Sequence, residues 1–238
     1  MKIALIGYGR IGIEIATIAA QKGIQVTDIF DINKPFVAGN YSFDVAIDFS
    51  TADCVRQNVL LATEMKKNIV IGTTGWYAHL PELRSIVGNS IACVWSSNFS
   101  IGMQIYYKVI ADMTRRFNET ALYDVFVSEQ HHRNKIDSPS GTAISIGNII
   151  LENSTQKETL QTEQLHRAIQ PTELHISATR GGSILGNHTV TFDSEFDSVE
   201  LTHRVKDRRG FAEGALYAAG WSIGKSGFYE FGEVLSPL

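Results

Sequence analysis

The 238-residue sequence has few cysteines, no excess of positive charge and no long apolar run, and each shortage excludes a class of protein. Cys54 and Cys93 are too few for a disulfide-rich secreted scaffold and lack the spacing of a metal site. No apolar run approaches the ~20 residues of a membrane-spanning helix, and the opening MKIALIGYGRIG reaches glycines too early for a signal peptide. We therefore expect a cytoplasmic protein with no membrane partner.

The charge balance excludes binding through a general positive field. The chain has 21 Lys and Arg against 25 Asp and Glu, a net charge of −4 at pH 7. Nucleic-acid binding is therefore not expected, and any anionic ligand must be held by a local site. With 44% hydrophobic and 19% charged residues the chain is typical of globular proteins, and its length allows one or two domains.

Short apolar runs alternate with helical patterns through the first hundred residues. This alternation predicts a doubly wound α/β sheet, in which ligands bind beyond the C-terminal ends of the strands. The expected strands span residues 2–6, 25–30, 45–47, 68–71 and 91–95, and the expected helices span 11–20 and 54–65.

The pattern changes near residues 98–103, which predicts a second architecture. Its extended segments suit a mixed or antiparallel sheet, and a final helix could pack back on the first domain. Residues 154–164 form the most polar, loop-like stretch. We expect helices at 101–114, 141–151 and 211–224, and extended segments at 121–128, 173–178, 187–192 and 198–203.

Gly7, Gly9 and Gly12 form a GxGxxG motif between the first predicted strand and helix. The first glycine permits a tight turn, the second a close approach to a pyrophosphate, and the third close packing of helix on strand. Asp31 follows Gly12 by 19 residues and can accept hydrogen bonds from a ribose 2′-hydroxyl. The motif predicts NADH or NADPH binding; the alternative is a glycine turn with Asp31 as a solvated strand cap.

Two further loops are candidates for the nucleotide site. Small residues with hydroxyls and free backbone amides can line a nicotinamide or ribose, although alone they would be ordinary turns. Ile32 stands where many NADPH-preferring enzymes place an arginine, so we expect NADH to be used at least as well as NADPH, with Arg10 and Lys34 as partial positive charges. The loop residues are Gly72, Thr73, Thr74, Ser96, Ser97, Asn98 and Phe99.

The stretch EQHHRNKIDSPSGTA holds the second candidate site. On a strand His131 and His132 point to opposite faces, which is poor geometry for one metal, so no metal is expected. His131 and Lys135, four residues apart, could share one pocket wall as proton donor and fixed cation.

A helix start follows in the same stretch. Ser140 is a natural N-cap, and the amides of Gly141 and Thr142 would face an anion such as a substrate carboxylate. The alternative is a pair of surface histidines beside a capped helix. We expect the other histidines, at 79, 166, 175, 188 and 203, to be structural or solvated, and Arg208 is a weak candidate for the pocket.

Several motifs are spread over almost the whole chain: GYGRIG, DFS, GTTG, SNFS, EQHHRNKIDSPSGTA, GNHT and LTHRVKDRRGFAEGA. Together they make the sequence resemble the dihydrodipicolinate reductase family, whose members are also called 4-hydroxy-tetrahydrodipicolinate reductases. The resemblance implies NAD(P)H-dependent reduction of this small dicarboxylate to tetrahydrodipicolinate in diaminopimelate and lysine biosynthesis. It also implies a Rossmann dinucleotide-binding domain, residues 1–102 and 212–238, and an α+β substrate and tetramerisation domain with a mixed sheet, residues 103–211, in a homotetramer.

The resemblance also implies roles for individual residues. His131 would be the general acid and Lys135 its catalytic partner, while His132, Ser140, Gly141 and Thr142 would contact substrate carboxylates. The nucleotide would be surrounded by Gly7, Tyr8, Gly9, Arg10, Ile11, Gly12, Asp31, Gly72, Thr73, Thr74, Ser96, Ser97, Asn98 and Phe99.

Three departures from the family pattern occur: a short segment between Asp31 and Asp48, Ser138 in place of alanine, and Ser96-Ser97 in place of small apolar residues. The short segment bears on the adenosine contacts and the cofactor preference. Two other functions are compatible with the nucleotide motif. One is another two-domain NAD(P)-dependent imine or amino-acid dehydrogenase, and the other is a non-catalytic nucleotide-sensing regulator.

Overall fold

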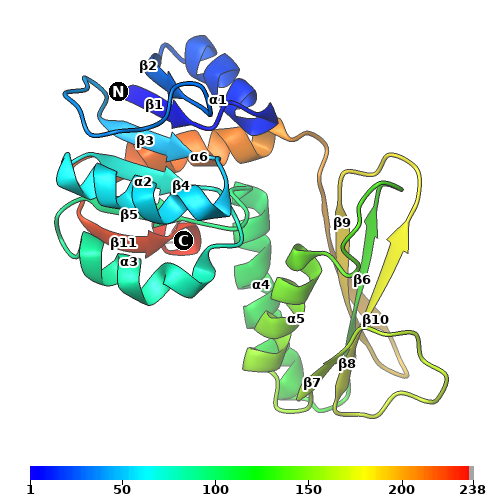
Figure 1. Ribbon diagram of the computed structural model, residues 1–238. Coiled ribbons are helices and arrows are strands. Elements are labelled where there is room, and N and C mark those ends of the chain that lie inside the picture. The colour runs from blue at the N-terminus through cyan, green and yellow to red at the C-terminus, as the bar shows by residue number, and fades with distance from the viewer. Residues whose placement is uncertain (236–238) are drawn as a thin grey trace. The chain divides into compact units, whose positions relative to one another are not determined.

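The computed structural model describes residues 1–235 and contains two compact units (Figure 1). The first unit is Met1–Gln104 together with the chain from Arg208 onward, and the second is Ile105–Asp207. The helix α4, Ile101–Asn118, contributes most of its length to the second unit. Each unit has its own sheet, so the α/β fold class with a second, mixed sheet is confirmed.

The first unit contains a six-stranded sheet in which every neighbouring pair is parallel, in the order β11-β5-β4-β3-β1-β2. The order reverses between β1 and β3, and ligands of doubly wound sheets bind at such a switch point. The strands are β1 (Lys2–Ile6), β2 (Gln25–Phe30), β3 (Val45–Asp48), β4 (Asn68–Ile71), β5 (Ala92–Trp95) and β11 (Gly227–Glu230).

Helices cover both faces of this sheet, which explains why its strands are apolar on both sides. In β1, Ile3 and Leu5 join the core under α1 and α6, while Ala4 and Ile6 join the opposite core under α2 and α3. The helices of this unit are α1 (Arg10–Gln21), α2 (Ala52–Glu64), α3 (Leu80–Val87), α6 (Arg209–Ser222) and α7 (Phe231–Val234), with a short 3-10 helix at Tyr77–His79.

The second unit contains a five-stranded sheet in the order β10-β9-β6-β8-β7. Its central strand β6 pairs antiparallel with β9 and parallel with β8, which makes the sheet mixed. The elements are β6 (Asp124–His131), α5 (Gly141–Asn153), β7 (Thr159–Gln161), β8 (Glu173–Arg180), β9 (Asn187–Asp193) and β10 (Ser198–Arg204).

One face of the second sheet packs on helices. On α4, Tyr106 donates hydrogen bonds from its hydroxyl to the carbonyls of His188 and Leu201, and Phe117 stacks on Phe192 with ring centroids 4.5 Å apart. Along β6, alternate residues are buried, and that alternation runs through to His131. The last residues on the buried face are polar, so this edge of the core carries titratable groups.

Several element boundaries differ from those expected. The strand expected at 121–128 is β6, Asp124–His131, because alternating burial continues three residues further. The polar stretch 154–164 was expected to be a loop, yet it contains β7, a three-residue strand that pairs with β8. The elements α3, α7 and β11 were not expected; each is short, and β11 forms through parallel pairing with the distant β5.

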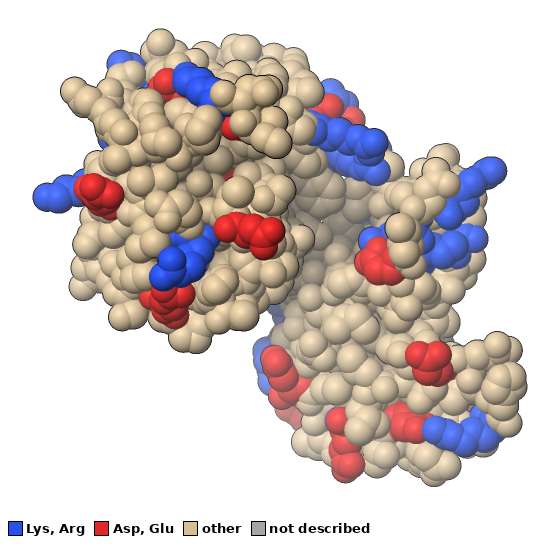
Figure 2. All heavy atoms as spheres, viewed as in Figure 1, with Lys and Arg blue, Asp and Glu red and all other residues tan. Residues whose placement is uncertain are grey.

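No helix within residues 1–235 has the length and apolar character needed to cross a membrane. On the face shown in Figure 2, acidic and basic side chains are interspersed over both units. The anion sites described below therefore depend on local groups rather than on a continuous basic surface.

Candidate active site

The glycine loop has the shape of an anion-binding turn. A Cβ at Gly7 would lie 2.4 Å from the carbonyl oxygen of Phe49, and one at Gly12 would lie 2.4 Å from that of Gly7. Gly9, in contrast, has nothing within 4 Å of the position of a Cβ, and it caps α1 without a side-chain hydrogen bond. The first-turn N–H groups of α1 are thus free for an anion in the space beside Gly9.

A cavity of about 680 Å³ adjoins this loop, and Asp31, the residue expected to bind a ribose hydroxyl, lies in its wall. It is lined by Gly7, Tyr8, Asp31, Ile32 and Asp53, among others. One carboxylate oxygen of Asp31 accepts the backbone N–H groups of residues 33 and 34 at 2.8 and 3.0 Å, which fixes the orientation of the side chain. The cavity therefore fits an adenosine ribose whose hydroxyls face Asp31.

A second cavity of about 330 Å³ is lined by residues 49–52 and 72–74 and is backed by a buried carboxyl group. Asp48, fully buried at the end of β3, accepts hydrogen bonds from the N–H of Ser50 (2.8 Å), the hydroxyl of Thr73 (3.2 Å) and the amide of Asn58 (2.8 Å). Burial raises the pKa of Asp48. Asp48 thus joins the loops that follow β3 and β4, and it was not among the site residues predicted from the sequence.

The residues after β5 differ in their access to a ligand. The Ser96 hydroxyl bonds to the backbone of Asn98, and the Phe99 ring is buried against Phe231 with centroids 4.7 Å apart. Ser97 is exposed and Asn98 is half-buried. Residues 96–99 line neither of the two cavities, and Ser96 and Phe99 use their side chains inside the fold.

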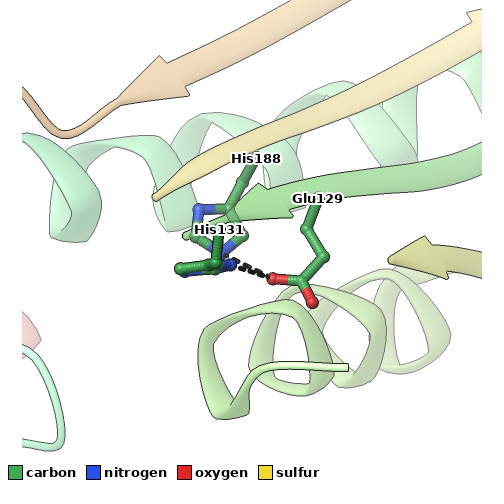
Figure 3. Close-up of side chains that lie close together, drawn as sticks. All are labelled: Glu129, His131 and His188. Carbon is green, nitrogen blue, oxygen red and sulfur yellow. Dashed lines mark ion pairs between the residues drawn. The ribbon is translucent and has the colours of Figure 1, made fainter. Parts of the chain in front are cut away.

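In the second unit, Glu129, His131 and His188 converge at the end of the sheet (Figure 3). Glu129 and His131 are two apart on β6 and so share its buried face, and His188 lies opposite Glu129 in the register of β9. The Nδ1 of His131 is 2.6 Å from one oxygen of Glu129, and the Nε2 of His188 is 3.8 Å from the same oxygen. All three side chains are at least nine-tenths buried.

The charges of the three side chains in this cluster follow from their burial and from the hydrogen bonds to Glu129. Burial raises the pKa of Glu129, but bonds from Arg180 (2.6 Å) and from the N–H of Ser140 (2.9 Å) outweigh burial and lower it overall. Burial lowers the pKa of His131 against the opposing effect of Glu129, and burial lowers that of His188 to about 4. At neutral pH the cluster therefore holds a carboxylate and two neutral imidazoles.

The start of α5 lies directly beside this cluster. Ser140 is buried, accepts the N–H of Ala143 at 3.2 Å as the predicted N-cap, and contacts the Nε2 of His188 at 3.2 Å. No atom lies within 4 Å of the position of a Cβ on the exposed Gly141. This end of α5 is therefore accessible, and the N–H of Gly141 faces the Asp137 carboxylate and helps to lower its pKa.

The residues predicted to act with His131 do not all lie on the same strand as His131. The strand ends at His131, and a turn follows in which the N–H of Lys135 bonds to the carbonyl of His132 at 3.1 Å. Lys135 therefore lies in a turn, and its place near His131 does not come from the regular four-residue spacing of a strand or a helix. Lys135 pairs with Asp137 at 2.8 Å, and its charge still lowers the pKa of His131. His132 is half-buried.

Glu129, His131 and His188 each offer a ligand atom within 4.8 Å of the others, which raises the question of a metal. Two ligands of a tetrahedral ion at about 2.0–2.1 Å lie about 3.3 Å apart. The 2.6 Å contact between His131 and Glu129 is shorter, and Arg180 already supplies a positive charge to the same carboxylate. The cluster is therefore too closely spaced for a tetrahedral ion, and it instead pairs a carboxylate with an imidazole.

Three members of this cluster were not predicted from the sequence. His188 was expected to be structural or solvated, and Glu129 and Arg180 were not assigned. The alternation of buried residues along β6 is the signal that could have found Glu129, since Val127, Glu129 and His131 follow one another on the inner face. Arg208, the weak candidate, caps α6 in the first unit.

The first unit has a doubly wound sheet with a glycine-rich loop of the dinucleotide-binding type, and the second has a buried histidine beside a helix start. These two features place the chain in the class of NAD(P)H-dependent oxidoreductases. Comparison with known proteins agrees. The family description "Dihydrodipicolinate reductase, N-terminus" matches residues 1–99, and "Dihydrodipicolinate reductase, C-terminus" matches residues 102–235.

Individual relatives cover the same length. A 4-hydroxy-tetrahydrodipicolinate reductase of Christiangramia forsetii is 35% identical over 100% of this chain and 99% of its own. The enzyme of that name from Methanoregula boonei is 39% identical over 81% of this chain and 74% of its own. The dipicolinate-bound dihydrodipicolinate reductase from Paenisporosarcina sp. TG-14 has the same fold, with a TM-score of 0.81, 21% identity and 99% coverage of both chains. The chain belongs to the dihydrodipicolinate reductase family.

The contrast between the loop glycines gives a test of the nucleotide site. Gly9→Ala fits the backbone, which has φ −81°, but places a methyl group in the free space beside the anion loop. We expect it to weaken NADH binding at least about tenfold with little change in thermal stability. Calorimetric titration with NADH and thermal unfolding measure the two effects.

Gly220→Ala on α6 is the matched control, because nothing lies within 4 Å of its Cβ either. It should leave NADH affinity unchanged. Wild-type affinity in Gly9→Ala would contradict the assignment of this loop to the pyrophosphate.

Proposed function

We propose that this protein reduces 4-hydroxy-tetrahydrodipicolinate to tetrahydrodipicolinate in diaminopimelate and lysine biosynthesis. The overall reaction consumes the substrate, NAD(P)H and one proton, and it yields tetrahydrodipicolinate, NAD(P)⁺ and water. Bound reduced nicotinamide supplies the hydride. The chain itself must hold two carboxylates and deliver the proton to the reduced substrate.

The observation that carries this proposal is a buried imidazole beside a helix start that is open to anions. His131 is the proton donor, with Lys135 as its cationic partner. Ser140, Gly141 and Thr142, at the start of α5, bind one substrate carboxylate, with His132 as an additional contact. Because the Ser140 N–H already donates to Glu129, Ser140 contributes its hydroxyl, while Gly141 and Thr142 contribute their backbone amides and Thr142 also its hydroxyl. We infer that residues 103–211 bind the substrate and that residues 1–102 with 212–238 bind the dinucleotide.

The roles of His131 and Lys135 predict a loss of turnover without a loss of cofactor binding. The double variant His131→Asn/Lys135→Met should lower kcat by about a hundredfold or more, because it removes general acid catalysis and a fixed charge. NADH affinity should change little. The measurement is NADH and NADPH oxidation with substrate generated in place by the preceding synthase, alongside NADH titration.

His166→Asn/Lys225→Met makes the same chemical changes at exposed positions and should retain wild-type kcat. An unchanged kcat in the His131/Lys135 variant would reject the catalytic assignment. If the wild-type protein oxidised neither cofactor, the proposed function itself would fail.

For the cofactor, we propose that NADH is used at least as well as NADPH. Asp31 and Asp53 both line the adenosine cavity, and two carboxylates disfavour a 2′-phosphate. Ile32 is 96% exposed and offers no charge. The Lys34 ammonium lies 3.7 Å from Asp28 and 5.2 Å from the centre of the Phe30 ring, so much of its charge is already balanced.

This charge distribution predicts the effect of one substitution. Ile32→Arg should raise kcat/KM for NADPH by about tenfold, because a guanidinium can pair with the 2′-phosphate. The kcat/KM for NADH should change by less than about threefold, because NADH has no 2′-phosphate with which the guanidinium could pair; a tenfold change would correspond to about 1.4 kcal/mol. Ile136→Arg, at a 98% exposed position in the second unit, is the control. A wild-type kcat/KM for NADPH tenfold or more above that for NADH would refute the stated preference.

We further propose a homotetramer assembled through the open face of the second sheet. That face is opposite to α4 and α5, and hydroxyl and amide side chains cover its central strands, with Glu200 and Arg204 on the edge strand β10. Phe126, 40% exposed, lies opposite Thr191 on the neighbouring strand, and the hydroxyls of Thr189 and Thr202 pair at 3.0 Å. A flat face of this kind suits sheet-on-sheet packing between subunits.

Phe126→Glu should dissociate this assembly, because it places a charge in a dry interface. Light scattering after gel filtration should give four times the 26.3 kDa chain mass for the wild type and a lower multiple for the variant. Phe196→Glu, at an 84% exposed loop position, should keep the wild-type mass. A monomeric wild type would contradict the proposal.

A further inference from the structure

Glu129 combines complete burial with partners on both carboxylate oxygens. Its side chain is 0% exposed. One oxygen, Oε1, accepts the N–H of Ser140 at 2.9 Å and the Nη2 of Arg180 at 2.6 Å. Arg180 also donates to the carbonyl of Asp137 at 2.6 Å, so its guanidinium is fixed on this side. Because both partners of Oε1 are donors only, this oxygen must remain an acceptor.

The other oxygen, Oε2, determines which nitrogen of His131 carries hydrogen. Oε2 is 2.6 Å from Nδ1, neither of these buried atoms makes a hydrogen bond to another group, and at neutral pH Glu129 is a carboxylate without a hydrogen of its own. Two lone pairs would repel at this distance, so Nδ1 bears the hydrogen. A neutral imidazole has only one N–H group, and Nε2 is therefore bare.

Nε2 is also the nitrogen with room for a partner. A Cβ at position 186 would lie 3.0 Å from Nε2, and the glycine at that position leaves this edge of the ring free of a side chain. A neutral His131 in this tautomer can accept a proton at Nε2 but cannot donate one. To act as the acid it must first become an imidazolium.

The charges that face His131 decide when this occurs. Glu129, on its own strand, favours the imidazolium, whereas burial, Lys135 after the turn and Arg180 from β8 oppose it. His188, from β9, has its pKa lowered to about 4 and is neutral. A dicarboxylate at the start of α5 would offset the charge of Lys135 and remove part of the opposition.

We propose that Glu129 is a positioning residue that fixes His131 in the Nδ1–H tautomer and thereby couples uptake of the transferable proton at Nε2 to binding of the dicarboxylate substrate. The inference rests on the proposed function only in naming the ligand and His131 as the acid. Solvent supplies the proton to Nε2, and Nε2 passes it to the substrate carbon, after which His131 is again neutral with its hydrogen on Nδ1.

Glu129→Gln tests this tautomer without a large change in shape. Because Ser140 and Arg180 still require an acceptor, the amide oxygen must take the place of Oε1. The amide NH₂ then faces Nδ1, which must become the acceptor, and the neutral ring carries its hydrogen on Nε2 instead. A role that was only structural would not reverse the tautomer.

The primary measurement is ¹⁵N NMR of histidine-labelled protein near pH 7.5, with the His131 signals assigned by their loss in His131→Asn. We expect Nδ1–H in the wild type and Nε2–H in Glu129→Gln. Glu173→Gln is the matched control, because Glu173 is also on the second sheet and pairs with Arg167 at 2.6 Å. It should keep Nδ1–H at His131.

The second measurement is proton uptake on binding pyridine-2,6-dicarboxylate, determined by calorimetry in buffers of different ionisation enthalpy. Wild type and Glu173→Gln should take up a substantial fraction of one proton, and Glu129→Gln should take up at least threefold less. With turnover measured alongside, kcat of Glu129→Gln should fall at least tenfold while NADH affinity is unchanged.

An Nε2–H tautomer in the wild type, or equal proton uptake by wild type and Glu129→Gln, would overturn the proposal. The wild-type tautomer decides the matter even if the variant does not fold. Failure of the proposed function would instead appear as wild-type protein that oxidises neither NADH nor NADPH, whatever its histidine tautomer.

Discussion

Oriented backbone N–H groups at the start of two helices are the feature on which both candidate sites depend. A chain with a net charge of −4 has no general field with which to attract a dinucleotide or a dicarboxylate. The first turn of α1 opens after Gly9, and that of α5 opens after Ser140, each with free space in front of it. Oriented amides thus replace surface cations as the binding groups for anions.

Each unit also has a buried carboxyl group near its helix start: Asp48 lies beside Ile6, which precedes the glycine loop, and Glu129 accepts the N–H of Ser140. The two carboxyl groups differ in charge for a physical reason. Asp48 accepts hydrogen bonds only from neutral groups, so burial raises its pKa and disfavours the anion. Glu129 also accepts a bond from the Arg180 guanidinium, which lowers its pKa overall. A fixed anion behind the dinucleotide loop would repel phosphates, whereas a fixed anion beside His131 can hold an imidazolium.

Local pattern was sufficient for most of the first unit. The runs at β1, β2 and β4 are apolar or β-branched and lie between turn signals, and two of the loop glycines, Gly7 and Gly12, are required by backbone contacts that the motif predicts. Short strands at sheet edges were not predictable. β11 and β7 have four and three residues, and each exists because a distant strand pairs with it.

The candidate site was predictable only in part, for the same reason. Ser140 and Gly141 follow from helix-start chemistry, and Glu129 could have been found from the alternation along β6. The position of His188 could not, because its contact with Glu129 arises from the register of β6 on β9, between residues far apart in the sequence. Arg180 reaches the cluster through the parallel register with β8, which pairs it with His131.

The charge balance of the second site explains why a neutral histidine is the resting state. Glu129 is matched by Arg180, and Lys135 by Asp137, so the protein groups around His131 are close to neutral as a set. At the buried His131 an added positive charge is costly. A ligand with two negative charges makes the local field negative, and the imidazole is the group in the set whose ordinary pKa is nearest to neutral pH. Among the possible responses of this set to that ligand, proton uptake at His131 therefore has the smallest free-energy cost.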